Sequence, residues 1–149
     1  MLNWLFEHAE YYKWIEAVVE YAREEFHAEV ELLADENAYV YSIDGDKINV
    51  KGGAHPRDKL YILLHELGHL HRLAENHGDP TFFLDKSGDS NLRERTMTLM
   101  EEVLAWHKGE EIATELGIVI EHRAWQRLMN DSIGEYVQWI HEGERNEDS

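Results

Sequence analysis

Residues 60–69 read LYILLHELGH, an apolar run that ends in two histidines four positions apart. In an α-helix, residues four apart lie one above the other on the same face, so His65 and His69 can share one small cation. Glu66 lies beside them, offset around the helix, where it can reach water on the metal rather than the metal itself. This arrangement is that of zinc hydrolases, in which the metal acidifies water and the carboxylate accepts its proton.

The sequence around this motif predicts a helix. Leucines recur at helical spacing through it, at positions 60, 63, 64, 67, 70 and 73. Pro56 suits a first helical turn and Asp58 suits the positive end of the helix dipole, while Asn76 and Gly78 provide a stop. The alternative is a buried helix whose two histidines are only hydrogen-bonded. Polar side chains on such a leucine-rich face would be costly to bury without a metal or polar partners.

The chain as a whole indicates one folded intracellular domain. Its 149 residues are 43% hydrophobic, enough for a proper core, and we expect a single domain over residues 1–149 with a disordered tail at 143–149. The absence of cysteine excludes disulfides and thiolate zinc sites. The first residues lack the basic start and apolar stretch of a signal peptide, and no apolar run approaches membrane-spanning length. A cytoplasmic location is the simplest interpretation.

The net charge of −17 argues against nucleic acid or an anionic membrane surface as a partner. Solvated acidic helix faces are the ordinary explanation of such a charge. The alternative is an acidic interaction protein that imitates DNA phosphates and inhibits a DNA-binding partner without catalysis.

The pattern along the chain predicts an α+β domain. We expect an N-terminal helix over about 3–27 and then three short strands between 29 and 52, two of them joined as a hairpin by Asp44-Gly45. After the motif helix and a loop, helix resumes near Ser90 or Asn91 and runs to Gly109, followed by a further stretch ending near Gly117. A last helix occupies about 121–142, with a break around 130–134. Helix, a few strands and then helices make a small α+β fold.

A zinc ion held by two histidines needs a third protein ligand. The best candidates lie in residues 100–106, MEEVLAW. Glu101 and Glu102 flank the apolar arc of this helix about equally, so periodicity does not choose between them, and both can also belong to a solvated edge. The arc consists of Met97, Leu99, Met100, Val103, Leu104 and Trp106. His107 projects near the middle of that arc, as a core histidine, as the ligand of a three-histidine site such as SprT-type proteins use, or as the fourth ligand of a purely structural zinc site.

His65-Glu66-Leu67-Gly68-His69, followed by the Glu-x-x-Ala pattern from Glu102 to Ala105, resembles the glutamate-type zinc metallopeptidases (gluzincins). The chain is similar to the compact ImmA/IrrE-like peptidases and small phage-encoded relatives over roughly residues 1–110. The resemblance implies a minimal zincin-like domain with Zn²⁺ held by His65, His69 and Glu102, and Glu66 as general base. It also implies protein or peptide substrates in the cytoplasm, which is the host cytoplasm for a phage-encoded protein.

Other polar residues carry weaker signals. His71 is two positions from His69 and so points away from it, and His77 and Asp79 suit a helix cap and turn. A donor to the developing oxyanion is also needed, and His122, Tyr136 and Tyr61 are candidates between which spacing does not choose.

Overall fold

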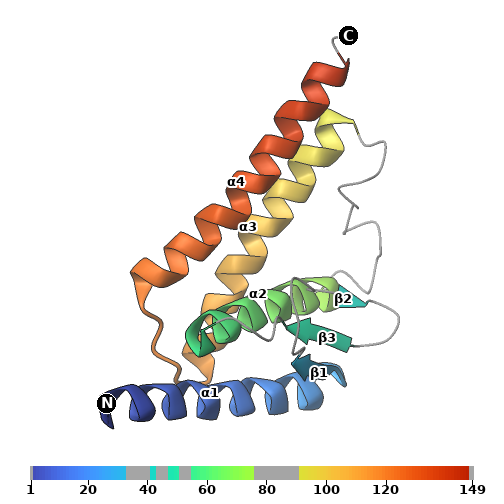
Figure 1. Ribbon diagram of the computed structural model, residues 1–149. Helices are drawn as coiled ribbons and strands as arrows, with labels where there is room; N and C mark the ends of the chain where they lie inside the picture. Colours follow the sequence, from blue (N-terminus) through green and yellow to red (C-terminus); the bar gives the residue numbers. More distant parts are fainter. Residues whose placement is uncertain (1, 33–40, 43–46, 51–54, 76–90, 148–149) are drawn as a thin grey trace.

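The computed structural model describes residues 2–32, 41–42, 47–50, 55–75 and 91–147 (Figure 1). Four helices run through this part of the chain: α1 (Leu2–Phe26), α2 (Pro56–Glu75), α3 (Leu92–Glu115) and α4 (His122–Glu147). The strands are β1 (Glu29–Leu32), β2 (Tyr41–Ser42) and β3 (Lys47–Val50). α2 packs on α1, while α3 and α4 run side by side as an antiparallel pair that projects away from them (Figure 1).

The expected α+β class is wrong, because the described residues form a helical fold. The four helices contain 25, 20, 24 and 26 residues, whereas the strands contain four, two and four. A strand of four residues is about 13 Å long and a helix of 24 residues about 36 Å, so these strands cannot form a layer that matches the helices. Apart from Ala28 and Ile118, the buried apolar residues of the described chain lie on helices.

The short strands lie beside the helices in the order β1-β3-β2. β1 pairs with β3 in parallel, with Val30 opposite Ile48, and β2 pairs with β3 in the antiparallel sense, with Tyr41 opposite Ile48. Residues 43–46, which contain the expected Asp44-Gly45 turn, lie outside the described residues.

α2 is the central element of the core. Its bounds, Pro56–Glu75, confirm the helix expected around the motif, and α1 confirms the expected N-terminal helix. Leucines of α2 pack with Ile15 and Val18 of α1 on one side and with Trp106 and Trp125 of α3 and α4 on the other. The helix is thus surrounded by other helices, and its polar motif lies inside the protein.

α2 and α3 approach to backbone contact. A Cβ atom added at Gly68 would clash with the carbonyl oxygen of Ala105, and one added at Gly109 would lie 2.8 Å from the carbonyl oxygen of Leu64. One glycine on each helix therefore fixes the distance between them. Gly109 therefore lies inside α3 as a contact with α2, whereas we expected it to end the helix.

The ends of α3 have well-formed caps. The Asn91 side chain accepts a hydrogen bond from the Glu94 N–H, and Glu94 reaches back to the N–H of Asn91, which forms a capping box. At the other end, Gly117 has a positive φ of 73°, and Ile118 N–H donates to the Ala113 carbonyl. α4 runs without the expected break at 130–134 and extends to Glu147, past residue 143 where we expected a disordered tail to begin.

Within the described residues, no helix combines the length and apolar character that crossing a membrane requires.

Candidate metal centre

His65 and His69 lie on adjacent turns of α2 and face the same way. Their ring centroids are 4.6 Å apart, and the residues are only 7% and 8% exposed. The close contact of Gly68 with α3 brings this turn of α2 against the neighbouring helix. The two imidazoles therefore face α3 in the interior of the protein.

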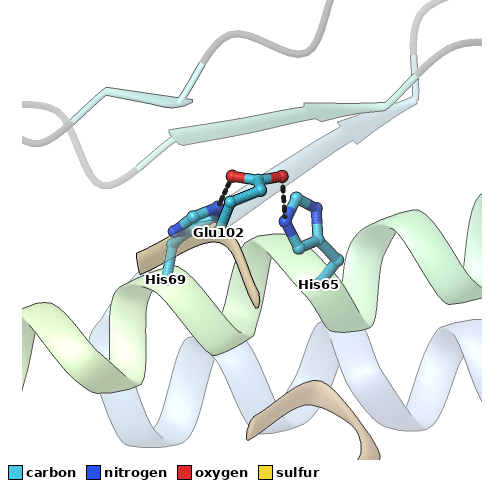
Figure 2. A group of neighbouring side chains, drawn as sticks. All are labelled: His65, His69 and Glu102. Atoms are coloured by element: carbon cyan, nitrogen blue, oxygen red, sulfur yellow. Dashed lines mark ion pairs between the residues drawn. The ribbon is translucent and has the colours of Figure 1, made fainter. Parts of the chain in front are cut away.

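Glu102 of α3 connects the two histidines (Figure 2). One carboxylate oxygen, Oε1, lies 2.8 Å from His65 Nε2, and the other, Oε2, lies 3.0 Å from His69 Nε2. Glu102 is 4% exposed, so this charge is removed from water. The structure thus brings Glu102 to the position that the gluzincin resemblance implied for the third ligand.

The donor atoms of these three residues fit a zinc ion. All of them lie within 4.8 Å of one another, and they offer two imidazole nitrogens and a carboxylate oxygen. The Nε2 atoms of the two histidines lie 2.8 and 3.0 Å from different oxygens of Glu102, close to the spacing of roughly 3.3 Å expected between ligand atoms about 2.0 Å from a tetrahedral zinc ion. Within the described chain, the buried Nε2 of His65 makes no hydrogen bond despite its short distance to Glu102.

The charges of the cluster shift the pKa values of its members. Burial alone would lower the pKa of His69, but the carboxylates of Glu101 and Glu102 outweigh it and raise this pKa to about 10. Burial alone would raise the pKa of Glu102, but its pairing with His65 and His69 holds the pKa far below the ordinary value. Glu102 is therefore an anion, which is the form that binds a cation.

Glu66 lies next to the two imidazoles and is also buried. Its Oε1 is 3.5 Å from His65 Nδ1, on the other side of that ring from Glu102. Glu66 is outside the group of three that surrounds the candidate metal position. Glu66 is thus a buried carboxylate next to His65 that is separate from the three candidate ligands.

Glu101 points to a different partner from its neighbour. Both of its carboxylate oxygens accept hydrogen bonds from Arg72 Nε, at 3.0 and 2.8 Å, and its Oε1 lies 3.6 Å from His69 Nδ1. It is buried like Glu102, but only Glu102 faces the Nε2 atoms of both histidines.

The suggestion that His107 is a core histidine or a metal ligand is wrong. Its side chain is 58% exposed, and with Glu110 and His122 it lines a surface hollow of about 580 Å³. His71 faces Glu75, with 3.2 Å between its Nδ1 and the carboxylate, so it points away from the centre as expected. His77 and Asp79 lie outside the described residues.

α4 contributes two side chains: Ser132, which the sequence did not indicate, and Tyr136, one of the three candidate oxyanion donors. Ser132 donates a hydrogen bond of 2.8 Å to Glu102 Oε1, and the Tyr136 hydroxyl is also hydrogen-bonded to Glu102. Burial, together with the charges of Glu102 and Glu66, raises the pKa of Tyr136 well above its ordinary value, so the hydroxyl stays protonated. The only signal in the sequence is that the two residues lie four apart on one helix.

The other two candidate donors lie elsewhere. The Tyr61 hydroxyl accepts a hydrogen bond from the Glu121 N–H in the core, and the His122 side chain is 88% exposed. Trp106 stacks on His65 with 4.2 Å between ring centroids and 13° between planes. The sequence did not indicate this contact. Trp106 holds the His65 imidazole flat against α3.

Comparisons of this chain with protein-family models, with curated proteins and with solved structures found no match.

Proposed function

We propose that this protein is a zinc-dependent metallopeptidase whose metal is held by His65, His69 and Glu102. The observation that carries the proposal is one buried carboxylate lying within 3.0 Å of the Nε2 atoms of two imidazoles on adjacent helical turns. Two nitrogens and one oxygen form a ligand set typical of catalytic zinc, which keeps a further position for water.

Zinc in this position supplies a Lewis acid that acidifies water and polarises the scissile carbonyl. Glu66, whose carboxylate lies next to the His65 ring, is the general base that accepts the proton of the attacking water and then donates it to the leaving amine. Tyr136 is the donor that we assign to the developing oxyanion, because among the three candidates it alone reaches Glu102. Its raised pKa keeps the hydroxyl protonated, and in this role the proton that it directs to Glu102 turns to the oxyanion.

The substrate class comes from the resemblance to ImmA/IrrE-like and phage-encoded peptidases. It supports a protein or peptide substrate inside the cell, cleaved in the cytoplasm. The acidic surface, with a net charge of −17, favours a substrate with basic segments over an acidic one.

The first experiment measures zinc content by elemental analysis and cleavage of a library of fluorogenic peptides on the same preparations. We expect one zinc per chain, and we expect Glu66→Gln to keep the zinc but lose cleavage. His65→Ala is expected to lose both. Glu111→Gln serves as the matched control, because it removes a similar charge from the exposed face of α3 and should change neither. Cleavage that persists after complete removal of metal would contradict the proposal.

The burial of the centre favours a second candidate, a structural zinc site. Ser132 and Tyr136 of α4 both contact Glu102, and the three candidate ligands are at most 8% exposed. A structural ion would stabilise the fold directly, and chelation would unfold the protein. The two candidates differ in the unaltered protein, since a structural site predicts that it binds zinc but cleaves no peptide.

A further inference from the structure

We propose that Glu101, held in place by Arg72, is a positioning residue that orients His69 for metal binding. This inference rests on the proposed function, because it concerns an outer partner of one proposed ligand. Neighbouring glutamates of α3 face the two nitrogens of one imidazole: Glu102 lies 3.0 Å from His69 Nε2, and Glu101 lies 3.6 Å from His69 Nδ1, which is an ion-pair rather than a hydrogen-bond distance.

The Glu101 carboxylate is itself fixed. Arg72 lies about one helical turn beyond His69 on α2, and its Nε donates to both oxygens of Glu101, at 3.0 and 2.8 Å. Glu101 is 6% exposed, so its carboxylate is paired inside the protein and is not a solvated charge on the helix edge. Arginine, glutamate and histidine therefore form a chain that crosses from α2 to α3 and returns to α2.

The consequence for His69 concerns which nitrogen carries the proton. A metal-binding imidazole must present one nitrogen without a proton, and an acceptor at the other nitrogen fixes both the tautomer and the ring orientation. With Glu101 facing Nδ1, the proton of the neutral ring stays there and Nε2 is directed toward Glu102 and the metal position. Removal of such an outer partner in metal sites typically weakens metal binding by about 10- to 100-fold.

The test measures the zinc dissociation constant by competition with a fluorescent chelator for the full-length protein and four variants. Glu101→Leu removes the acceptor and should weaken zinc binding about 10- to 100-fold. Glu101→Gln removes the charge but keeps an oxygen acceptor, so its affinity should remain within about threefold of the unaltered protein. Arg72→Leu should fall between these two. Glu111→Leu, which removes a charge elsewhere on α3, should leave the affinity unchanged.

Nuclear magnetic resonance of the zinc-loaded protein gives a readout that a purely structural role would not change. A slowly exchanging Nδ1–H signal of His69 is expected in the unaltered protein and in Glu101→Gln, and its loss is expected in Glu101→Leu. If Glu101→Leu does not fold, the double variant Arg72→Leu/Glu101→Leu removes both charges together and should show the same weakened affinity.

The outcomes separate this inference from the proposed function. Failure of the unaltered protein to bind zinc would overturn both. Zinc binding by the unaltered protein with equal affinity in Glu101→Leu would overturn the positioning role alone. Equal weakening in Glu101→Leu and Glu101→Gln would assign the effect to charge and would also overturn the positioning role.

Discussion

The two ends of α3 are packed in different ways. Over residues 92–100 the side chains face mostly outward, with Met97 and Met100 exposing 57% and 58% of their surface. Over residues 101–113, the inner end, the buried face combines acidic, small and large apolar residues: Glu101, Glu102, Ala105, Trp106, Gly109, Ile112 and Ala113. The inner end is therefore held by close backbone approach and a polar cluster as well as by the buried side chains of Trp106 and Ile112, and the candidate metal centre lies at that end.

Gly68→Ala tests the inner end most severely. The added Cβ would clash with the carbonyl oxygen of Ala105, which is backbone and cannot rotate away. We expect a loss of at least about 4 kcal/mol in the free energy of unfolding, together with loss of zinc binding. Gly134→Ala on α4 is the matched control: nothing lies within 4 Å of its added Cβ, and it should stabilise the protein by about 0.5–1 kcal/mol. Thermal unfolding measures both, and equal effects would show that α2 and α3 do not approach as described.

Leu64→Ala compared with Met97→Ala tests the difference between the two packing environments directly. Leu64 is fully buried where α2 meets α3, so its truncation should lower the free energy of unfolding by about 2–5 kcal/mol. Met97, at the outer end, should change it by less than about 0.5 kcal/mol. Urea titrations give both values. A large loss in the free energy of unfolding of Met97→Ala would mean that the outer end of α3, residues 92–100, is covered in solution.

A change of pH should act at the inner end through His69. Because its pKa is raised from 6.5 to about 10, the ion pair with Glu102 stabilises the metal-free protein fully below pH 6.5, and this stabilisation is lost as the pH rises through 10. Zinc must displace the His69 proton, so zinc affinity should increase by up to about tenfold per pH unit across this range. The zinc-induced rise in melting temperature, measured at each pH on one preparation, should grow accordingly. A rise that is independent of pH would contradict the role of His69 as a ligand.

Asn91→Ala tests the outer end alone. The variant removes the side chain that accepts from the Glu94 N–H, and we expect a loss of about 1 kcal/mol in the free energy of unfolding with no change in zinc affinity. Asn91→Ser keeps an acceptor and should remain close to the unaltered protein. A marked loss of zinc binding in Asn91→Ala would show that the two ends of α3 are coupled.

The sequence was sufficient for the motif helix, because its signal is local. Leucines at helical spacing and Pro56 at the start predicted α2 to within a residue, and the spacing of four placed His65 and His69 on one face. Long helices with repeated apolar positions carry such information in themselves.

The sequence was not sufficient to predict the buried face of α3, because several large apolar side chains of this helix are exposed while small ones are buried. We counted Met97, Met100 and Leu104 as part of a core-facing arc, but all three are exposed. The face that packs against α2 is centred instead on Ala105 and Gly109, which permit backbone contact. Because we centred the buried face on that arc, we also placed His107 wrongly in the core and left Glu101 and Glu102 equivalent.

The fold class depends on the lengths of the strands, and a pattern of alternating residues does not give those lengths. The strand signals between 29 and 52 predict three short strands and with them an α+β class, whereas the described strands have two to four residues beside helices of twenty or more. Ser132 and Tyr136 could not be assigned to the centre either, since their contact with Glu102 depends on how α4 packs against α3.

The flat stacking of Trp106 on His65 gives the protein an internal optical reporter. Indole emission responds to an imidazole in stacking contact, and binding of a divalent ion to that imidazole changes the response. Occupancy of the centre can therefore be followed from the intrinsic fluorescence of the unlabelled chain, in real time and without a substrate.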